Sequence, residues 1–85
     1  MEDHNIEVNG EEWLLRFSRL RGQADGWCQY GDNKILVHSG LTGVDRLDVV
    51  IHELLHAFFP ELSEESVTAA ATGIARVLWQ IGVRC

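Results

Sequence analysis

The chain has 85 residues, 46% of them hydrophobic, and its 13 acidic residues against 7 basic ones give a net charge of −6. This length allows one domain, residues 1–85, and the acidic balance argues against nucleic acid as a partner, because phosphate binding needs clustered lysine and arginine. No apolar run is long enough to span a membrane and the N-terminus is acidic, unlike a signal peptide, so we expect a cytoplasmic protein with no membrane partner.

The first 40 residues are expected to form a small sheet. Ile6 and Val8 lead into Asn9-Gly10, a dipeptide typical of a two-residue hairpin turn. Trp13, Leu15 and Phe17 alternate with Leu14, Arg16 and Ser18, which is typical of a strand with one strongly apolar face. A short extended piece is expected at residues 26–30, and a strong strand at residues 34–38. We predict a three-stranded sheet from these patterns.

A first helix is expected from Thr42 to just before Pro60. Thr42 is a candidate N-cap, with Asp45 in the first turn near the positive end of the helix dipole. Pro60 ends the helix, because the residue before a proline avoids the helical conformation. Apolar residues at helical spacing predict the stripe that faces the core: Leu47, Ile51, Leu54, Leu55 and Phe58.

The last two turns of this helix carry His52-Glu53-Leu54-Leu55-His56, which matches the zinc motif H-E-x-x-H. Two histidines four residues apart leave the same helix face, so both imidazoles can hold one zinc ion. Glu53 projects beside the metal, where a carboxylate can take a proton from water. The plain alternative is a surface helix that happens to carry two histidines and a glutamate.

A second helix is expected to begin at Ser63, an N-cap candidate followed by two acids. The link between the helices is short, so they should pack as an antiparallel pair against one face of the sheet. Gly82 is the expected stop. The predicted apolar face of this helix consists of Val67, Ala70, Ala71, Ile74, Leu78 and Ile81.

The third zinc ligand is expected in the first turn of the second helix. In an antiparallel pair closed near Pro60, His56 faces that turn, which contains Glu64 and Glu65. Glu64 shares a face with Val67 and so points toward the first helix. We therefore predict Glu64 as the ligand and keep Glu65 as the alternative, since a one-residue shift of the helix start would exchange them. Acids in a first turn are also explained by the helix dipole alone.

An H-E-L-L-H helix followed by an acid that opens a second helix resembles the gluzincin group of zinc metallopeptidases. The order of sheet, active-site helix and glutamate helix is similar to its minimal forms, the minigluzincins, and to short zinc-peptidase-like proteins of bacteriophages and bacteria. The resemblance implies that His52, His56 and Glu64 or Glu65 bind Zn²⁺ and that Glu53 is the general base. It also implies that the strand at residues 34–38 is the sheet edge that pairs with a peptide substrate.

These patterns together predict an α+β fold and a zinc-dependent metallopeptidase, or a peptidase-like protein, that acts on a peptide or protein. Zinc would activate water for attack on a peptide carbonyl, with Glu53 as the general base. The link between His56 and Glu64 is shorter than in larger gluzincins and leaves little protein to hold a substrate. Two alternatives remain: a structural metal-binding module without catalysis, and a metal-free protein-interaction domain.

One histidine and the two cysteines are further candidates for a role in or near the site. His38 ends a strand shortly before the motif helix and is a candidate substrate contact, although a strand-end surface histidine explains it equally well. Cys28 and Cys85 fit a reducing compartment as free thiols. Cys28, beside Trp27 and Tyr30, is best explained as a small buried hydrophobe.

Overall fold

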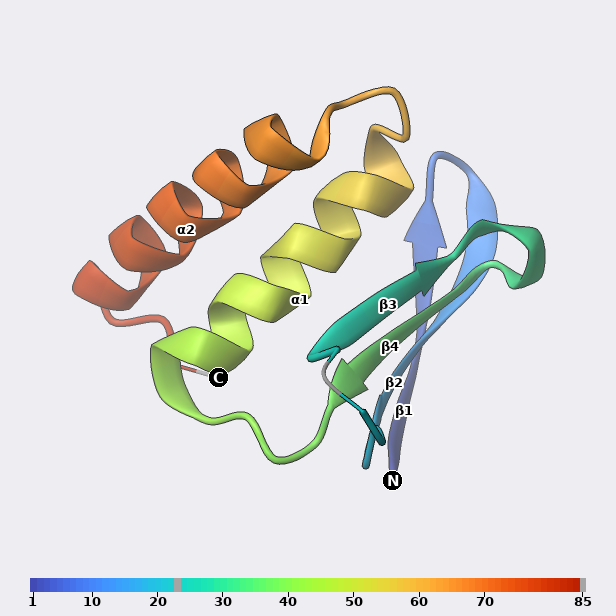
Figure 1. Ribbon diagram of the computed structural model, residues 1–85, viewed down its shortest axis with the longest axis horizontal. Coiled ribbons are helices and arrows are strands. Elements are labelled where there is room, and N and C mark those ends of the chain that lie inside the picture. The colour runs from blue at the N-terminus through green and yellow to red at the C-terminus, as the bar shows by residue number, and fades with distance from the viewer. Residues whose placement is uncertain (23, 85) are drawn as a thin grey trace.

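The computed structural model describes residues 1–22 and 24–84 and has an α+β architecture (Figure 1). A four-stranded sheet comes first in the chain and two helices follow. The elements are β1 (Glu2–Val8), β2 (Glu11–Ser18), β3 (Gly26–Gln29), the 3₁₀ turn η1 (Tyr30–Asp32), β4 (Lys34–His38), α1 (Gly43–Phe58) and α2 (Glu64–Gln80).

The predicted hairpin is confirmed. β1 and β2 pair antiparallel, with Val8 opposite Glu11. Asn9 and Gly10 both have positive φ, 51° and 83°, which is the backbone of a type I′ turn. The buried face of this hairpin supplies Val8, Trp13, Leu15 and Phe17 to the core.

The prediction of three strands is wrong, because the sheet has four, in the order β1-β2-β4-β3. The extended piece at residues 26–30 contributes β3, which pairs antiparallel with β4, while β4 runs parallel to β2. β3 has only four residues and begins with a glycine, so it is too short for alternation along the chain to reveal it.

The predicted edge position of residues 34–38 is also wrong. β4 lies between β2 and β3, and its Ile35 and Val37 are completely buried. A strand with neighbours on both sides has its backbone groups paired in the sheet, so it cannot add a peptide. β3 is the free edge on this side of the sheet.

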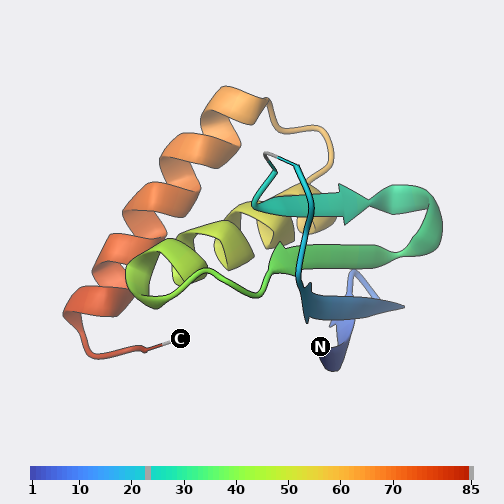
Figure 2. The same cartoon turned by 60° about the horizontal axis from the view of Figure 1, so that its bottom comes forward.

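The two helices run antiparallel, as predicted, but they do not both cover the sheet. α1 packs on β3 and β4, whereas α2 packs mainly on α1 (Figure 1). Figure 2 again shows α1 between α2 and the strands, so the molecule has three layers. α1 therefore has two faces against protein, which a single apolar stripe does not describe. On its sheet side α1 contributes Ala57 to the buried core, and four partly buried residues pack against that core: Val49, Val50, Leu54 and Phe58.

The buried face of α2 differs from the predicted one. Val67, Ala71 and Ala75 are buried, at a spacing of four residues, while Ile74 is 41% exposed and Ile81 is 71% exposed. Small side chains on the inner face let α2 lie close to α1, and the larger aliphatic residues are left on the outside. Within the described ranges, neither helix combines the length and apolar character needed to cross a membrane.

Candidate metal centre

Hydrogen bonds from two turns of the sheet region hold the end of α1 that carries the histidines. The Tyr30 hydroxyl donates a hydrogen bond to the backbone carbonyl of His56 at 2.9 Å. The Asn9 side-chain amide donates to the carbonyl of Phe58 at 3.0 Å. The last carbonyls of a helix have no partner within the helix, so these two bonds satisfy them and fix this turn against the sheet.

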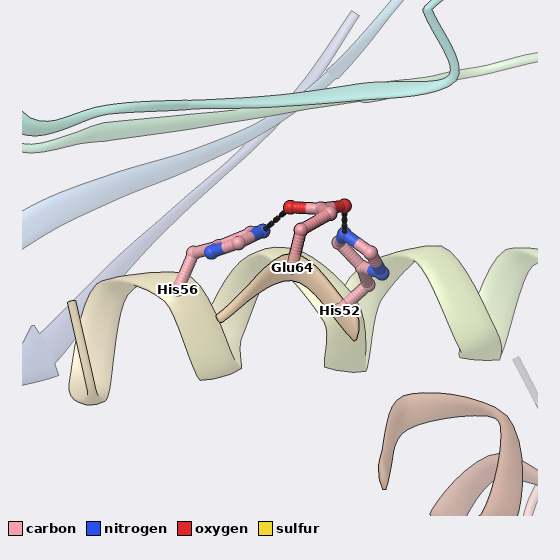
Figure 3. A group of neighbouring side chains, drawn as sticks. All are labelled: His52, His56 and Glu64. Carbon is pink, nitrogen blue, oxygen red and sulfur yellow. Dashed lines mark hydrogen bonds and ion pairs between the residues drawn. The ribbon is translucent and has the colours of Figure 1, made fainter. Parts of the chain in front are cut away.

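α2 brings one carboxylate to the two histidines. The Ser63 side chain accepts a hydrogen bond from the backbone N–H of Ser66 at 3.1 Å, which confirms Ser63 as the N-cap and sets the first turn of α2. His52 Nε2 then lies 2.9 Å from Glu64 Oε1, and His56 Nε2 lies 2.8 Å from Glu64 Oε2. Figure 3 shows the Glu64 carboxylate spanning the two rings.

The three side chains form a group whose donor atoms all lie within 4.8 Å of one another. Two imidazole nitrogens and a carboxylate oxygen are ligands that zinc takes at about 2.0–2.2 Å, and a tetrahedral site with three protein ligands keeps one open position. The donor set therefore fits Zn²⁺. Glu65, the alternative ligand, is exposed and does not belong to this group among the described residues.

Glu53 differs from Glu64 in its surroundings. Its exposed fraction is only 8%, and its carboxylate has no hydrogen-bond partner among the described residues. Burial raises the pKa of Glu53 to about 6, the positive charge of His56 opposes this rise, and the negative charge of Glu64 adds to it. A carboxylate with a pKa this close to neutrality can both accept and return a proton.

Glu53 and the ligand group open into one hollow of about 300 Å³ between α1, β3 and the start of α2. A Cβ atom on Gly26 would lie 2.8 Å from Glu53 Oε2 and 2.9 Å from both Glu53 Cγ and Val49 Cγ1. Only glycine therefore lets β3 pass this close to the Glu53 side chain. The hollow is lined by Gly26, Trp27, Cys28, Tyr30, His52, Glu53, His56 and Glu64.

Cys28 faces the hollow as a neutral thiol. Burial and the negative charge of Glu53 raise the pKa of Cys28 to about 11, although the neighbouring Tyr30 hydroxyl works against the rise. The thiolate is the form that attacks electrophiles and binds metals, so a protonated thiol is not a nucleophile here. Burial also raises the pKa of the Tyr30 hydroxyl. Cys85 lies outside the described residues.

His38 occupies a different position from the ligand group. Its Nδ1 accepts a hydrogen bond from the backbone N–H of Leu20 at 3.1 Å, and a Cβ atom on Gly40 would lie 2.8 Å from its Nε2. His38 is not among the residues that line the hollow. The ring holds the loop after β2 against the end of β4, and its role as a substrate contact stays a prediction.

Three residues that shape the site had no functional role in the sequence argument. Gly26 makes room for Glu53, while Tyr30 and Asn9 bind the end of α1. In the sequence, Gly26 and Tyr30 only bracket a short extended piece. That pattern does not predict which residues of the helix they contact.

Comparisons of the chain with protein-family models, with curated proteins and with solved structures gave no match. The function is therefore inferred from the geometry of the hollow.

Proposed function

We propose that this chain is a zinc-dependent metallopeptidase of minimal size, with His52, His56 and Glu64 as the zinc ligands. The observation that carries the proposal is the convergence of these three donor groups beside Glu53, a largely buried glutamate whose carboxylate accepts no hydrogen bond from the described residues. A bound zinc ion would supply Lewis-acid polarisation of a carbonyl and would lower the pKa of water to about 7.

Glu53 acts as the general base in this proposal. Its carboxylate takes one proton from the attacking water, whose oxygen forms a bond to the peptide carbonyl carbon. The carbon–nitrogen bond then breaks, and Glu53 returns the proton to the leaving amine nitrogen. Burial makes this carboxyl more basic than an exposed glutamate, which suits a group that first takes and then returns a proton.

β3 is the strand on which an extended substrate docks in this proposal. β3 is an edge strand, and Gly26, Trp27 and Cys28 on it line the hollow. An edge strand can add a further strand through backbone hydrogen bonds, which binds a peptide whatever its side chains. The Trp27 side chain, 60% exposed, adds an apolar surface beside this edge.

The open shape of the hollow favours short, extended peptide segments as substrates. Glu64 is 68% exposed in its side chain, and the link between α1 and α2 is only five residues, 59–63, with no insertion that could cover the hollow. The hollow therefore stays open to solvent above a bound substrate, so weak binding and a high KM are expected.

The test combines zinc content with peptide hydrolysis. Wild-type protein should contain one zinc per chain and cleave unstructured peptides. His56→Ala should lose the metal, and Glu53→Gln should retain zinc while hydrolysis falls by about 10²–10⁴-fold. Glu65→Gln is the matched control for Glu64→Gln, because only the second removes a ligand.

Two other outcomes would each favour a different function. Less than about 0.2 zinc per chain in the wild type contradicts the metal site and favours a metal-free interaction domain, because a three-ligand site should retain its ion through purification. Full zinc content with hydrolysis no higher than that of Glu53→Gln favours a structural metal-binding module.

A further inference from the structure

The metal hollow is one end of a longer depression. A second hollow shares Gly26, His52, Glu53 and Glu64 with it, and a third shares Asp25, Asp48 and Val49 with the second. The three hollows thus form one trough, which runs from Tyr30 past Glu53 to Asp45, between the start of β3 and the two helices.

The trough is strongly acidic. Five carboxylate side chains line it, and none of the described residues that line it is a lysine or an arginine. A zinc ion on the histidines would offset only two of the five negative charges. The acidic residues are Asp25, Asp45, Asp48, Glu53 and Glu64.

Two observations show that these carboxylates differ from an ordinary solvated acidic surface. Glu53 opens into two of the three hollows although its exposed fraction is only 8%, and none of the described residues donates a hydrogen bond to its carboxylate, which leaves the carboxylate oxygens to face the hollows. Asp48 is held in place, because the Thr72 hydroxyl donates a hydrogen bond to its Oδ2 at 3.1 Å. The trough is therefore shaped to receive positive charge.

We propose that the trough selects peptides that carry a lysine or arginine just after the bond to be cut, with Asp25 and Asp48 as the groups that bind the basic side chain. This inference rests on the proposed peptidase function. A peptide paired antiparallel with β3, the more stable pairing, runs from Tyr30 toward Asp25. Residues that follow a scissile bond placed at Glu53 then lie against Asp25 and Asp48.

The catalytic test uses ten-residue peptides of alanine, serine and leucine. The peptides differ only in the residue just after the cleaved bond, which is lysine, glutamine or glutamate. Zinc-loaded wild type should show kcat/KM for the lysine peptide about tenfold above that for the glutamate peptide at low salt, with the difference shrinking in 0.5 M NaCl. The double variant Asp25→Asn/Asp48→Asn should keep its zinc and lose this preference.

The matched control is Glu7→Gln/Glu11→Gln, which removes two negative charges from exposed positions of the β1–β2 hairpin. This control should keep the preference of the wild type. Equal rates on the lysine and glutamate peptides, a preference for lysine before the cleaved bond, or an unchanged preference in the Asp25→Asn/Asp48→Asn variant would each overturn the inference.

A binding measurement separates this inference from the proposed function. Trp27 lines the hollow and is 60% exposed, so its fluorescence can report peptide binding to Glu53→Gln, which cannot cleave. The lysine peptide should bind about tenfold more tightly than the glutamate peptide, and Asp25→Asn/Asp48→Asn should abolish the difference. Basic preference in binding without cleavage by wild type would contradict the peptidase and support the trough. Cleavage by the wild type without any preference for the lysine peptide would support the peptidase and contradict the role of the trough.

Discussion

The two walls of the hollow are held in place by different forces. The α2 wall is Glu64 alone, and the α1–β3 wall consists of Gly26, Trp27, Cys28, Tyr30, His52, Glu53 and His56. Glu53 in the α1–β3 wall is buried by packing against β3, whereas Glu64 in the α2 wall is two-thirds exposed and is held by its contacts with both histidines. Packing persists when charges change, but an exposed ion pair contributes little by itself.

This difference indicates how the site responds to an ion. The α1–β3 wall should have the same shape with and without metal, because the core and two capping hydrogen bonds hold it. The α2 wall should depend on the metal, which would take the place of the direct contacts between Glu64 and the histidines.

The largest expected effect is on zinc affinity when either wall loses a ligand. His56→Ala and Glu64→Ala should each lower the affinity at least about 100-fold, since even partners outside the ligand set are worth 10–100-fold. Competition with a chromophoric chelator measures this, and Glu65→Ala is the control that should bind like wild type. If Glu64→Ala bound zinc as tightly as the wild type, Glu64 would not be a zinc ligand.

Gly26→Ala should break the α1–β3 wall without removing a ligand. The new Cβ would overlap Glu53 Cγ and Val49 Cγ1, and overpacking of this kind costs about 1–3 kcal/mol. Urea unfolding measures the loss. Gly31→Ala is the control, because its Cβ meets nothing within 4 Å, and a similar loss there would contradict the role of Gly26.

Glu53→Gln should stabilise the metal-free protein at high pH only. The pKa of Glu53 is raised from 4.5 to about 6 in the folded state, so folding favours the protonated form. The wild type should therefore lose up to about 2 kcal/mol as the pH rises from about 4.5 through 6, and the variant should be spared this loss. Urea unfolding in a chelator at pH 4 and pH 8 measures it, and an equal gain at both pH values would contradict it.

The smallest expected effects come from removing one hydrogen bond that supports each wall. Tyr30→Phe loses the bond to the His56 carbonyl and should cost about 1 kcal/mol, while its ring keeps the edge contact with Trp13. Ser63→Ala removes the cap of α2 and should cost a similar amount. Only Tyr30→Phe should also loosen the position of His56, which chemical shifts of the His56 ring in the metal-free protein would report.

Features set by local chemistry could be predicted from the sequence. Asn9-Gly10 produced the hairpin, because those residues accept positive φ, and Ser63 and Pro60 marked the helix limits. Glu64 was preferred over Glu65 because it shares a helix face with Val67, and it is Glu64 that lies against both histidines.

Features set by contacts between distant segments could not be predicted in this way. β3 is too short to show a period, and its position outside β4 reverses which strand is the free edge. The inner face of α2 follows Val67, Ala71 and Ala75, because a helix that packs on another helix can bury small residues and leave Ile74 and Ile81 outside.

The sequence by itself determined the motif, the helix that carries it and the acid that opens the next helix, since each depends on residues a few positions apart. Only the tertiary structure decided that Glu53 is buried and that β3 lies over it. It also decided that Asp25 and Asp48 continue the hollow as an acidic trough. The reason is physical: burial and the pKa of a carboxylate depend on which segments cross above it, and Gly26 reaches Glu53 from 27 residues away along the chain.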